Sequence, residues 1–258
     1  MAEWFGSRSR RMIMKVSATV HLIDDLTGMP VRGSNARVWI ESQRPPIKKN
    51  DGVNIFCDLP EGEYTLIAEG GQYARTEVVC NITAQNCSNI TLRLVPNKLY
   101  PVPFDAVRIE GKAFPEALVR IWQADRTNAL KLLSDAAKGS SVIGIYINSD
   151  INISGKLLKI VSADDKGEYI RVSGIENKER SEYRLEEELT QDHQKMGTSL
   201  IQVCECRADI NGDFMLMIKK GSGDKMVCET DDPDKKTSVQ KTIDIGDSKY
   251  IKMTFEDT

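Results

Sequence analysis

The sequence predicts an all-β fold that contains two β-sandwich domains in tandem, with short helical insertions in the second domain. Three observations support this prediction. Apolar and polar residues alternate over short segments, clusters of Gly, Pro, Asn and Asp separate these segments, and motifs of the first half return in the second. An alternation of period two is typical of a strand that buries one of its faces.

The bulk composition is that of a folded protein with no obvious polyanionic partner. The chain has 258 residues, enough for two ordinary domains, and its net charge of −3 gives no drive toward nucleic acid. No segment approaches the length of a membrane-spanning helix, and Lys15 ends the apolar run at 12–14 too early for a signal peptide. We therefore expect synthesis in the cytoplasm, no nucleic-acid partner and no membrane insertion.

Residues 14–24, MKVSATVHLID, form the first predicted strand. Val16, Ala18, Val20 and Leu22 occupy one face, and polar residues occupy the other. Turn residues follow, then the alternating segment ARVWI and the strand VNIFCDL.

The stretch DLPEGEYTLIAEGGQY predicts a reversal of the chain. Pro60 fixes φ at the first corner and Gly62 gives freedom at the exit, so we expect a hairpin that carries Tyr64 and Leu66 into the core. Gly62→Val should cost stability without affecting any binding chemistry. The segments YARTEVVCNI and NITLRLV then continue the sheet.

Three motifs of the first half carry a resemblance to a known family. They are G-x-P-V at 28–31, A-x-V-x-I at 36–40, and F-x-x-L-P-x-G-x-Y-x-L-x-A at 56–68. Together they resemble the carboxypeptidase regulatory-like domain, a transthyretin-like β-sandwich, over residues 14–96. The resemblance implies a non-catalytic module of the kind appended to enzymes, receptors, adhesins and secreted assemblies. The catalytic domain of zinc carboxypeptidases is not found in this sequence, so no peptidase activity is expected.

The rest of the chain predicts a linker and a second sandwich. Residues 97–103 belong to a proline-rich, semi-rigid stretch, and the domain at 104–258 repeats the A-x-V-x-I pattern and two polar turns, at 163–169 and 208–214. We expect this domain to be an elaborated transthyretin- or immunoglobulin-like sandwich. Helical insertions are predicted at 127–139 and 181–197, since Leu185 and Leu189 lie one helical turn apart.

The sequence offers no convincing metal or cofactor site. DINGD at 209–213 begins like a calcium loop but lacks the required Gly and Glu, so an Asn-Gly hairpin turn is expected. Cys204, Cys206, Cys228 and His193 could supply soft ligands, yet the common zinc spacing is missing, and we expect cysteines that face a core. Cys80 and Cys87 could bridge a short loop only under oxidising conditions.

No catalytic residue is predicted either. His21 lies on the polar face of a predicted strand and His193 in a predicted solvated helix, and no nucleophile elbow, phosphate loop or dinucleotide motif is present. A non-enzyme is therefore expected. The enzyme hypothesis would return if a pocket with converging polar groups formed at His193 or at the Cys204 and Cys206 pair.

The arm at 1–13 is the candidate partner-binding segment. Its aromatic and arginine side chains are of the types that dominate protein interfaces: Trp4, Phe5, Arg8, Arg10 and Arg11. A frayed terminus, or an arginine contact with membrane or nucleic acid, is the competing interpretation. The leading functional hypothesis is a non-enzymatic structural or adaptor subunit of a large assembly, for which fold analogy indicates a phage tail or a phage-tail-like contractile injection particle.

The alternative hypothesis is an adhesion module that binds carbohydrate or a surface protein through loops of a sandwich. Trp39, Trp122 and Tyr146 are the side chains that would stack on sugars, although each lies at an alternating position that is equally compatible with a core.

Overall fold

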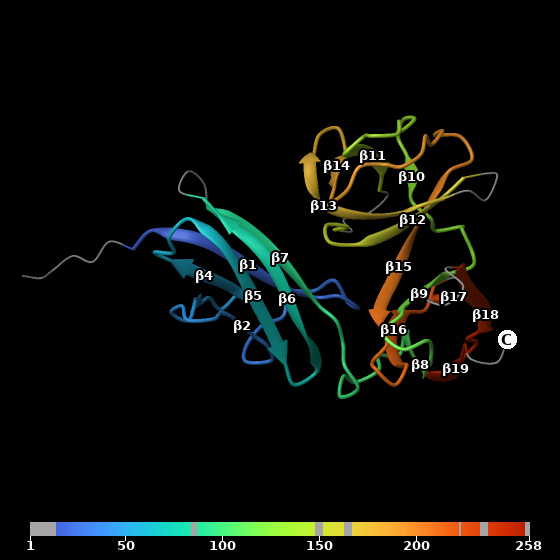
Figure 1. Cartoon of the computed structure of the whole chain (residues 1–258), viewed down its shortest axis with the longest axis horizontal. Coiled ribbons are helices and arrows are strands. Elements are labelled where there is room, and N and C mark those ends of the chain that lie inside the picture. Colours follow the sequence, from blue (N-terminus) through green and yellow to red (C-terminus); the bar gives the residue numbers. More distant parts are fainter. Residues whose placement is uncertain are drawn as a thin grey trace, which may run out of the picture. The chain divides into compact units, whose positions relative to one another are not determined.

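The computed structural model describes residues 14–83, 87–147, 152–162, 167–221, 223–232 and 237–255. These residues form strands, turns and loops, and none of them belongs to a helix of the kind that crosses a membrane. The all-β prediction is confirmed (Figure 1). The described residues divide into two compact units, one drawn from 14–23, 30–70 and 75–92, the other from 24–29, 71–74 and 93–255.

The first unit contains two sheets, with strand orders β3-β4-β1-β7 and β2-β5-β6. The strands are β1 (Val16–Asp24), β2 (Arg37–Ile40), β3 (Ile47–Lys48), β4 (Val53–Cys57), β5 (Gly62–Gly70), β6 (Tyr73–Ile82) and β7 (Ser88–Leu94). The alternation predicted for β1 is confirmed at Ala18, Val20 and Leu22, which are buried. It is wrong at the start of the strand, where Val16 is 41% exposed and Ser17 is buried, because the register with β4 shifts between Val16 and Ala18. From the other sheet, Val38, Ile40 and Leu66 are buried as well.

The predicted hairpin at Pro60 is wrong. β4 lies in the four-stranded sheet and β5 in the three-stranded sheet, so the turn carries the chain from one sheet to the other (Figure 1). Tyr64 is half-buried and its hydroxyl donates to the carbonyl of Pro60 at 3.1 Å, which closes this corner. Leu66 is fully buried, as expected. Likewise β6 and β7 belong to different sheets and do not continue one sheet.

The second unit holds a nine-stranded sheet, β10-β11-β14-β13-β12-β15-β9-β17-β18, and a three-stranded sheet, β16-β8-β19. The strands are β8 (Ala106–Lys112), β9 (Leu118–Gln123), β10 (Lys131–Leu132), β11 (Val142–Tyr146), β12 (Leu157–Val161), β13 (Tyr169–Asn177), β14 (Glu182–Leu185), β15 (Ser199–Arg207), β16 (Asp213–Lys219), β17 (Lys225–Asp232), β18 (Thr237–Asp244) and β19 (Tyr250–Thr254).

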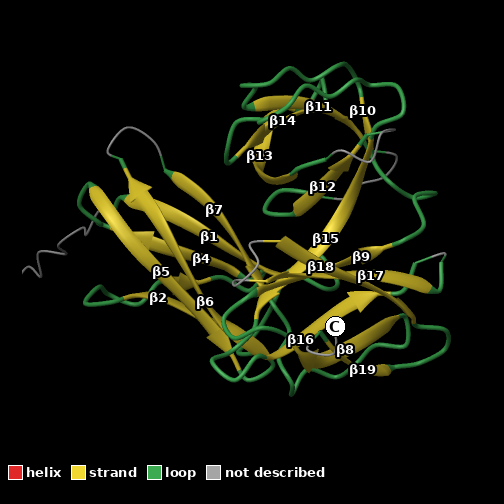
Figure 2. Cartoon of the chain, turned by 45° about the vertical axis from the view of Figure 1, so that its right-hand side comes forward, coloured by secondary structure: helices red, strands yellow, loops and turns green. Residues whose placement is uncertain are grey.

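Strand β15 joins two halves of the large sheet. Its residues 199–203 pair with β12, and its residues 204–207 pair with β9 (Figure 2). One apolar core contains Val119, Ile121 and Phe214 and lies where the β9 and β17 part of the sheet faces β16-β8-β19. A second core contains Ile145 and Leu158 and lies among the strands on the β12 side. The divided pairing of β15 therefore connects two cores within one unit.

Both predicted helical insertions are wrong. Within 127–139 the chain forms β10, which pairs with β11, and within 181–197 it forms β14, which pairs with β11 and β13. Leu185 and Leu189 are buried in the same core. A spacing of four residues places two side chains on one face of a helix, but an even spacing also places them on one face of an extended chain. In both segments the neighbouring strands provide hydrogen-bond partners for the backbone, and this pairing favours the extended conformation over a helix.

The segment predicted as a linker, 97–103, belongs to the second unit. Its Tyr100 hydroxyl donates to Asp24 Oδ2 at 2.6 Å, and the Tyr73 hydroxyl donates to the same oxygen at 2.9 Å. The two rings lie edge to face, with centroids 5.7 Å apart. Burial, followed by the hydrogen bond to Asp24, raises the pKa of both tyrosines, so the hydroxyls remain protonated donors.

Candidate functional site

A network of charged and aromatic side chains covers one face of the nine-stranded sheet. Strand register explains its assembly: Gln240 is opposite Glu229, Glu229 is opposite Arg120, and Arg120 is opposite Glu205 on four adjacent strands. Directly opposed residues project to the same face of a sheet. We call this network the Glu229 cluster. Its members are Arg120, Lys159, Tyr169, Arg171, Glu205, Glu229, Asp231 and Gln240.

Glu229 is the hub of the cluster. Its side chain is 5% exposed. Tyr169 donates its hydroxyl to Oε1 at 2.5 Å, Lys159 Nζ lies 3.3 Å from Oε2, and Gln240 also donates to Oε2. Since Lys159 and Tyr169 are opposed on β12 and β13, the carboxylate ties the β17 side of the sheet to the β12 side.

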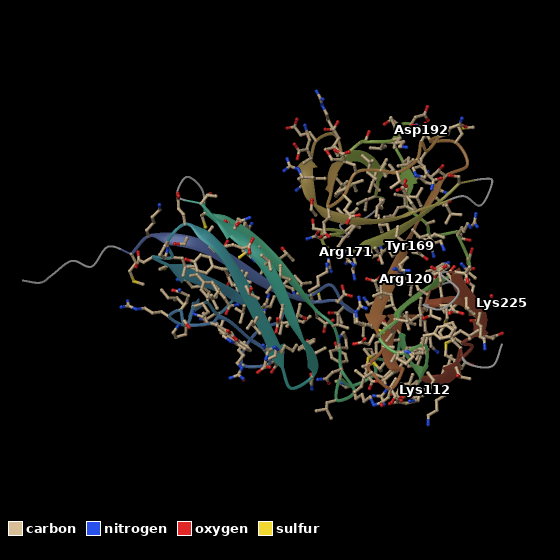
Figure 3. The ribbon with its side chains drawn as sticks, in the orientation of Figure 1. Lys112, Arg120, Tyr169, Arg171, Asp192 and Lys225 are labelled. Carbon is tan, nitrogen blue, oxygen red and sulfur yellow. The ribbon has the colours of Figure 1, made fainter. Side chains whose placement is uncertain are left out.

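Arg120 and Arg171 complete the cluster through carboxylates. Arg120 Nε donates to Glu205 Oε2 at 2.8 Å, and its Nη1 lies 3.4 Å from Asp231. Arg171 Nη2 donates to the other oxygen of Glu205 at 3.1 Å. Figure 3 shows Arg120, Tyr169 and Arg171 lying close together. Three cations thus meet three carboxylates within the cluster, and Arg171 also pairs with Glu186 outside it, with Nε 3.6 Å from Oε2.

Aromatic rings accompany the cations. The guanidinium carbon of Arg120 lies 4.5 Å from the ring centre of Tyr169. Lys159 Nζ lies 4.0 Å from the ring centre of Trp122 and 4.9 Å from that of Tyr169. Such contacts stabilise a cation that has lost part of its hydration. The ammonium of Lys159 is therefore held by two rings and one carboxylate.

The electrostatics of the cluster favour fixed protonation states. Burial alone would raise the pKa of Glu229, but the hydrogen bond from Tyr169 and the charge of Lys159 outweigh it, so this pKa lies below its ordinary value. Burial and the bond to Glu229 raise the pKa of Tyr169. Neither group is poised to exchange a proton near neutral pH. The cluster is thus suited to hold strands together and not to acid–base chemistry.

A pocket of about 320 Å³ lies elsewhere in the second unit. We call it the Gln202 pocket. Its described lining residues are Asp25, Leu26, Ile121, Trp122, Gln123, Asp125, Asn128, Ala129, Leu130, Lys156, Leu200, Ile201, Gln202, Cys204, Met217, Ile218, Lys219, Lys220, Gly221 and Met226. Its wall combines buried apolar side chains, such as Ile121 and Met226, with exposed polar ones, such as Gln202 and Asn128.

Several charged groups of this pocket are bound to other protein groups. Lys156 Nζ donates to the carbonyl and the carboxylate of Asp25, and Lys220 Nζ donates to the carbonyl of Gly246. Asp125 Oδ1 accepts from the amide and the hydroxyl of Thr127. Sequence reasoning missed this pocket because its walls come from six separate stretches of the chain.

The pocket includes Cys204, yet its chemistry does not revive the enzyme hypothesis. Burial raises the pKa of Cys204 to about 11 and those of Cys206 and Cys228 to about 12. A thiol in this state is a poor nucleophile. The expectation that these cysteines face a core is confirmed, since Cys228 is buried and the other two pack against the same core.

His193 does not lie in a solvated helix, and that prediction is wrong. It is 2% exposed, its backbone pairs with Ala136, and its Nε2 lies 2.7 Å from Glu168 Oε1. Ser162 Oγ lies 3.4 Å from Nδ1, which gives the chain of groups Ser162, His193 and Glu168. Glu168 also accepts from Thr190 and Gln191. The histidine is buried and the Glu168 carboxylate accepts hydrogen bonds at both oxygens, so this arrangement fastens the 190–193 segment to the residue that precedes β13.

The other candidate residues lie apart from one another. His21 is half-buried on β1, as expected for the polar face. Cys80 and Cys87 are both free thiols. Among the described residues, no group of His, Cys, Asp and Glu could hold a metal ion.

The DINGD segment forms a turn but not a hairpin. Asp209 Oδ1 accepts from the amides of Asn211 and Asp213, and Gly212 has a φ of 79°. β15 precedes this turn and β16 follows it, and the two strands belong to different sheets. The prediction of an Asn-Gly turn is confirmed, and the prediction of a hairpin is wrong.

The three candidate sugar-stacking aromatics differ in exposure. Tyr146 is 53% exposed and Trp122 is 7% exposed, with its ring covered by Lys159. Trp39 is half-buried, and the guanidinium carbon of Arg37 lies 5.0 Å from its ring centre. Of the three, Tyr146 is the most exposed.

Strand β6 forms an exposed edge of the first unit. It is the last strand of the sheet β2-β5-β6, and beyond its contact with Val95 and Pro96 no other described strand pairs with its outer side. Val78 and Val79 are 36% and 60% exposed. The candidate partner-binding residues Trp4, Phe5, Arg8, Arg10 and Arg11 lie outside the described residues.

Comparison with known proteins yields only loose structural overlaps. No family model and no curated protein matches the chain. The Bacillus anthracis TIE protein overlaps 93% of this chain at 10% identity and a TM-score of 0.27, and this chain spans 50% of that one. A DUF3823 family protein from Bacteroides ovatus overlaps 88% of this chain and 99% of its own, at 12% identity and a TM-score of 0.24. The shaft pilin SpaA from Lactobacillus rhamnosus GG, in a mutant form, overlaps 94% and 97%, at 9% identity and a TM-score of 0.24. Overlaps at these TM-scores carry no argument about family, partners or ligands.

Proposed function

We propose that the protein is a non-enzymatic structural or adaptor subunit of a larger protein assembly. The observation that supports this proposal best is the edge strand β6, whose span Tyr73–Ile82 is ten residues long and largely exposed. A long exposed edge offers backbone groups for strand addition by an extended segment of another chain. Val79, on the exposed strand, would then contact the added segment.

The Glu229 cluster supports the same function from within the second unit. Its ion pairs and hydrogen bonds cross-link strands β9, β12, β13, β15, β17 and β18. A subunit that transmits load or positions its neighbours benefits from sheets that do not shear.

The first experiment measures the size of the native particle. Untagged protein in extract of its own source is separated by gel filtration, and co-migrating proteins are identified by mass spectrometry. We expect a large particle, and Val79→Lys should weaken the association because an edge lysine opposes strand addition. Ile210→Lys is the matched control, since Ile210 is 77% exposed and lies in a turn of the second unit.

The outcome that contradicts the proposal is elution as a free monomer near 28.9 kDa. Deletion of residues 1–13 tests the arm separately. If the arm contributes to docking, the deletion releases the subunit from the particle while Val79 remains intact. The finer proposal, a subunit of a phage tail or phage-tail-like contractile injection particle assembled in the cytoplasm, rests on analogy and is tested by the identity of the co-migrating proteins.

A carbohydrate- or surface-binding adhesion module is the second candidate. The 53% exposure of Tyr146 favours it, because an aromatic side chain at the surface can stack on a sugar. A glycan array should then show binding that is lost in Tyr146→Ala. Trp122→Ala is unsuitable as a test, because Trp122 is buried and its loss would damage the core. Absence of binding across a broad panel would contradict this candidate.

A further inference from the structure

We propose that the Gln202 pocket binds a small neutral ligand that carries several hydroxyl groups, of the size of a monosaccharide. The proposed role as an assembly subunit does not depend on ligand binding in this pocket. The inference concerns a different surface from that of Tyr146. It rests on the size of the pocket, the distribution of its apolar and polar groups, and the bonds already made by its charges.

The size and wall of the pocket suit a small amphipathic molecule. Its volume of about 320 Å³ falls within the range of ligand pockets, roughly 300–1,000 Å³. The accessible apolar part of the wall includes Ala129 and Leu130, which are half-buried, whereas Asn128 and Gln202 are exposed. A pyranose ring has the same division, with C–H groups on its faces and hydroxyls on its rim.

Two side-chain amides of the pocket, those of Gln123 and Gln202, make no hydrogen bond to another residue that the structure describes. An amide offers one acceptor and two donors, and a hydroxyl is itself both donor and acceptor. Two unpartnered amides on one pocket therefore match a ligand with several hydroxyls better than a ligand with acceptors alone.

The charges of the pocket argue for a neutral ligand. The ammonium of Lys156 is bound by Asp25, with Nζ 2.5 Å from Oδ1, and that of Lys220 is bound by the Gly246 carbonyl. An anion bound at Lys156 or Lys220 would have to break one of these contacts, and the third lysine of the wall, Lys219, is exposed to water. A neutral polyol can bind without breaking either contact.

Gly221 offers a way to test the position of Gln123. A Cβ added at Gly221 would lie 1.7 Å from Gln123 Nε2, so Gly221→Ala would displace that amide. Because the displaced atoms are the far end of a flexible side chain, the fold should tolerate the change. Gln202→Leu removes the second amide while keeping an apolar stem.

The experiment titrates free monosaccharides into the full-length protein and follows binding by isothermal calorimetry and ligand-observed NMR. The panel contains glucose, galactose, mannose, N-acetylglucosamine and the acyclic polyol mannitol, with glucuronate as a charged comparison. We expect at least one neutral member to bind with a Kd in the millimolar range. Gln202→Leu and Gly221→Ala should each weaken that binding about tenfold or more, since each leaves ligand hydroxyls unpaired.

The matched control is Gln72→Leu, which removes an exposed amide that does not line the pocket and should leave binding unchanged. Circular dichroism and thermal melts show that each variant is folded. The proposal is overturned if no neutral sugar or polyol binds to the folded protein, if glucuronate binds in preference to glucose, or if both pocket variants bind as the unaltered protein does. If sugar binding is lost in Tyr146→Ala and kept in Gln202→Leu, the adhesion candidate stands and the pocket proposal fails.

Discussion

Burial determines the reactivity of individual cysteines. Because thiols react as thiolates, Cys204, with a pKa of about 11, should be ionised in about one molecule in a thousand at pH 8. We expect iodoacetamide to label the exposed Cys87 first and to spare Cys204, Cys206 and Cys228 in the folded protein. Peptide mass spectrometry measures the order of labelling, and denatured protein should be labelled at all six cysteines. Labelling of Cys228 as fast as Cys87 would contradict this account.

Among the charged residues of the second unit, Glu229 should be the one whose substitution lowers the stability most. Glu229→Ala leaves Lys159 and Arg120 largely buried without their shared carboxylate, a loss that typically costs about 3–5 kcal/mol. Urea denaturation followed by circular dichroism measures the change. Glu176→Ala is the control, because Glu176 pairs with Arg184 at 2.6 Å on the surface, where such pairs contribute about 0–1 kcal/mol. Equal effects in both variants would refute the hub role of Glu229.

At the scale of single elements, the start of β5 depends on one glycine. Gly62 has a φ of 152°, in a region that side chains rarely adopt, so the backbone of any other residue is strained there. We expect Gly62→Ala to cost about 1–3 kcal/mol, and Gly62→Val at least as much. Gly71→Ala is the control, since an added Cβ there has open space. An unchanged melting temperature in Gly62→Ala would show that the backbone at the start of β5 adjusts to a side chain without strain.

The segment that carries His193 should loosen in acid. Burial alone would raise the pKa of Glu168, but the bonds from Thr190, His193 and Gln191 outweigh it, and the pKa lies below its ordinary value of 4.5. A depressed pKa gives stability that is present above pH 4.5 and is lost as the pH falls through the folded-state value. In Glu168→Gln this contribution is missing.

Denaturation at several pH values tests this linkage. The difference in unfolding free energy between the unaltered protein and Glu168→Gln should shrink as the pH falls from about 6 to about 3. Glu229 has a pKa shifted in the same direction and is present in both proteins, so its contribution cancels. If the difference in unfolding free energy stays constant with pH, the charge of Glu168 does not contribute to stability, and this account is wrong.

On the scale of the whole molecule, the two units have separate buried residues and should lose structure separately. Leu66 is fully buried in the first unit, so we expect Leu66→Ala to lower the free energy of unfolding of that unit by about 2–5 kcal/mol. Hydrogen exchange measured by mass spectrometry should then show faster exchange in β1, β4 and β5, with β9, β12 and β17 unchanged. Ile121→Ala, in a core of the second unit, should give the reverse pattern. Equal loss of protection in both units would show that they unfold as one.

The sequence by itself determined the strands that alternate apolar and polar residues, whereas β10 and β14 lie in stretches for which it predicted helices. Ala18, Val20 and Leu22, and later Val119 and Ile121, are buried at the alternating positions that the period-two pattern predicted. Such a pattern is local, because neighbouring side chains of an extended chain point to opposite faces whatever the strand later pairs with.

Only the tertiary structure decided how the strands pair and which side chains contact one another across neighbouring strands. The turn at Pro60 has the same residue pattern whether the next strand joins its own sheet or the opposite one, and a leucine spacing of four fits both helix and strand. The bond from Tyr169 to Glu229 joins residues 60 apart, and that from Arg120 to Glu205 joins residues 85 apart. The Glu229 cluster and the Gln202 pocket arise from long-range register, because only pairing of distant strands brings their side chains onto one face.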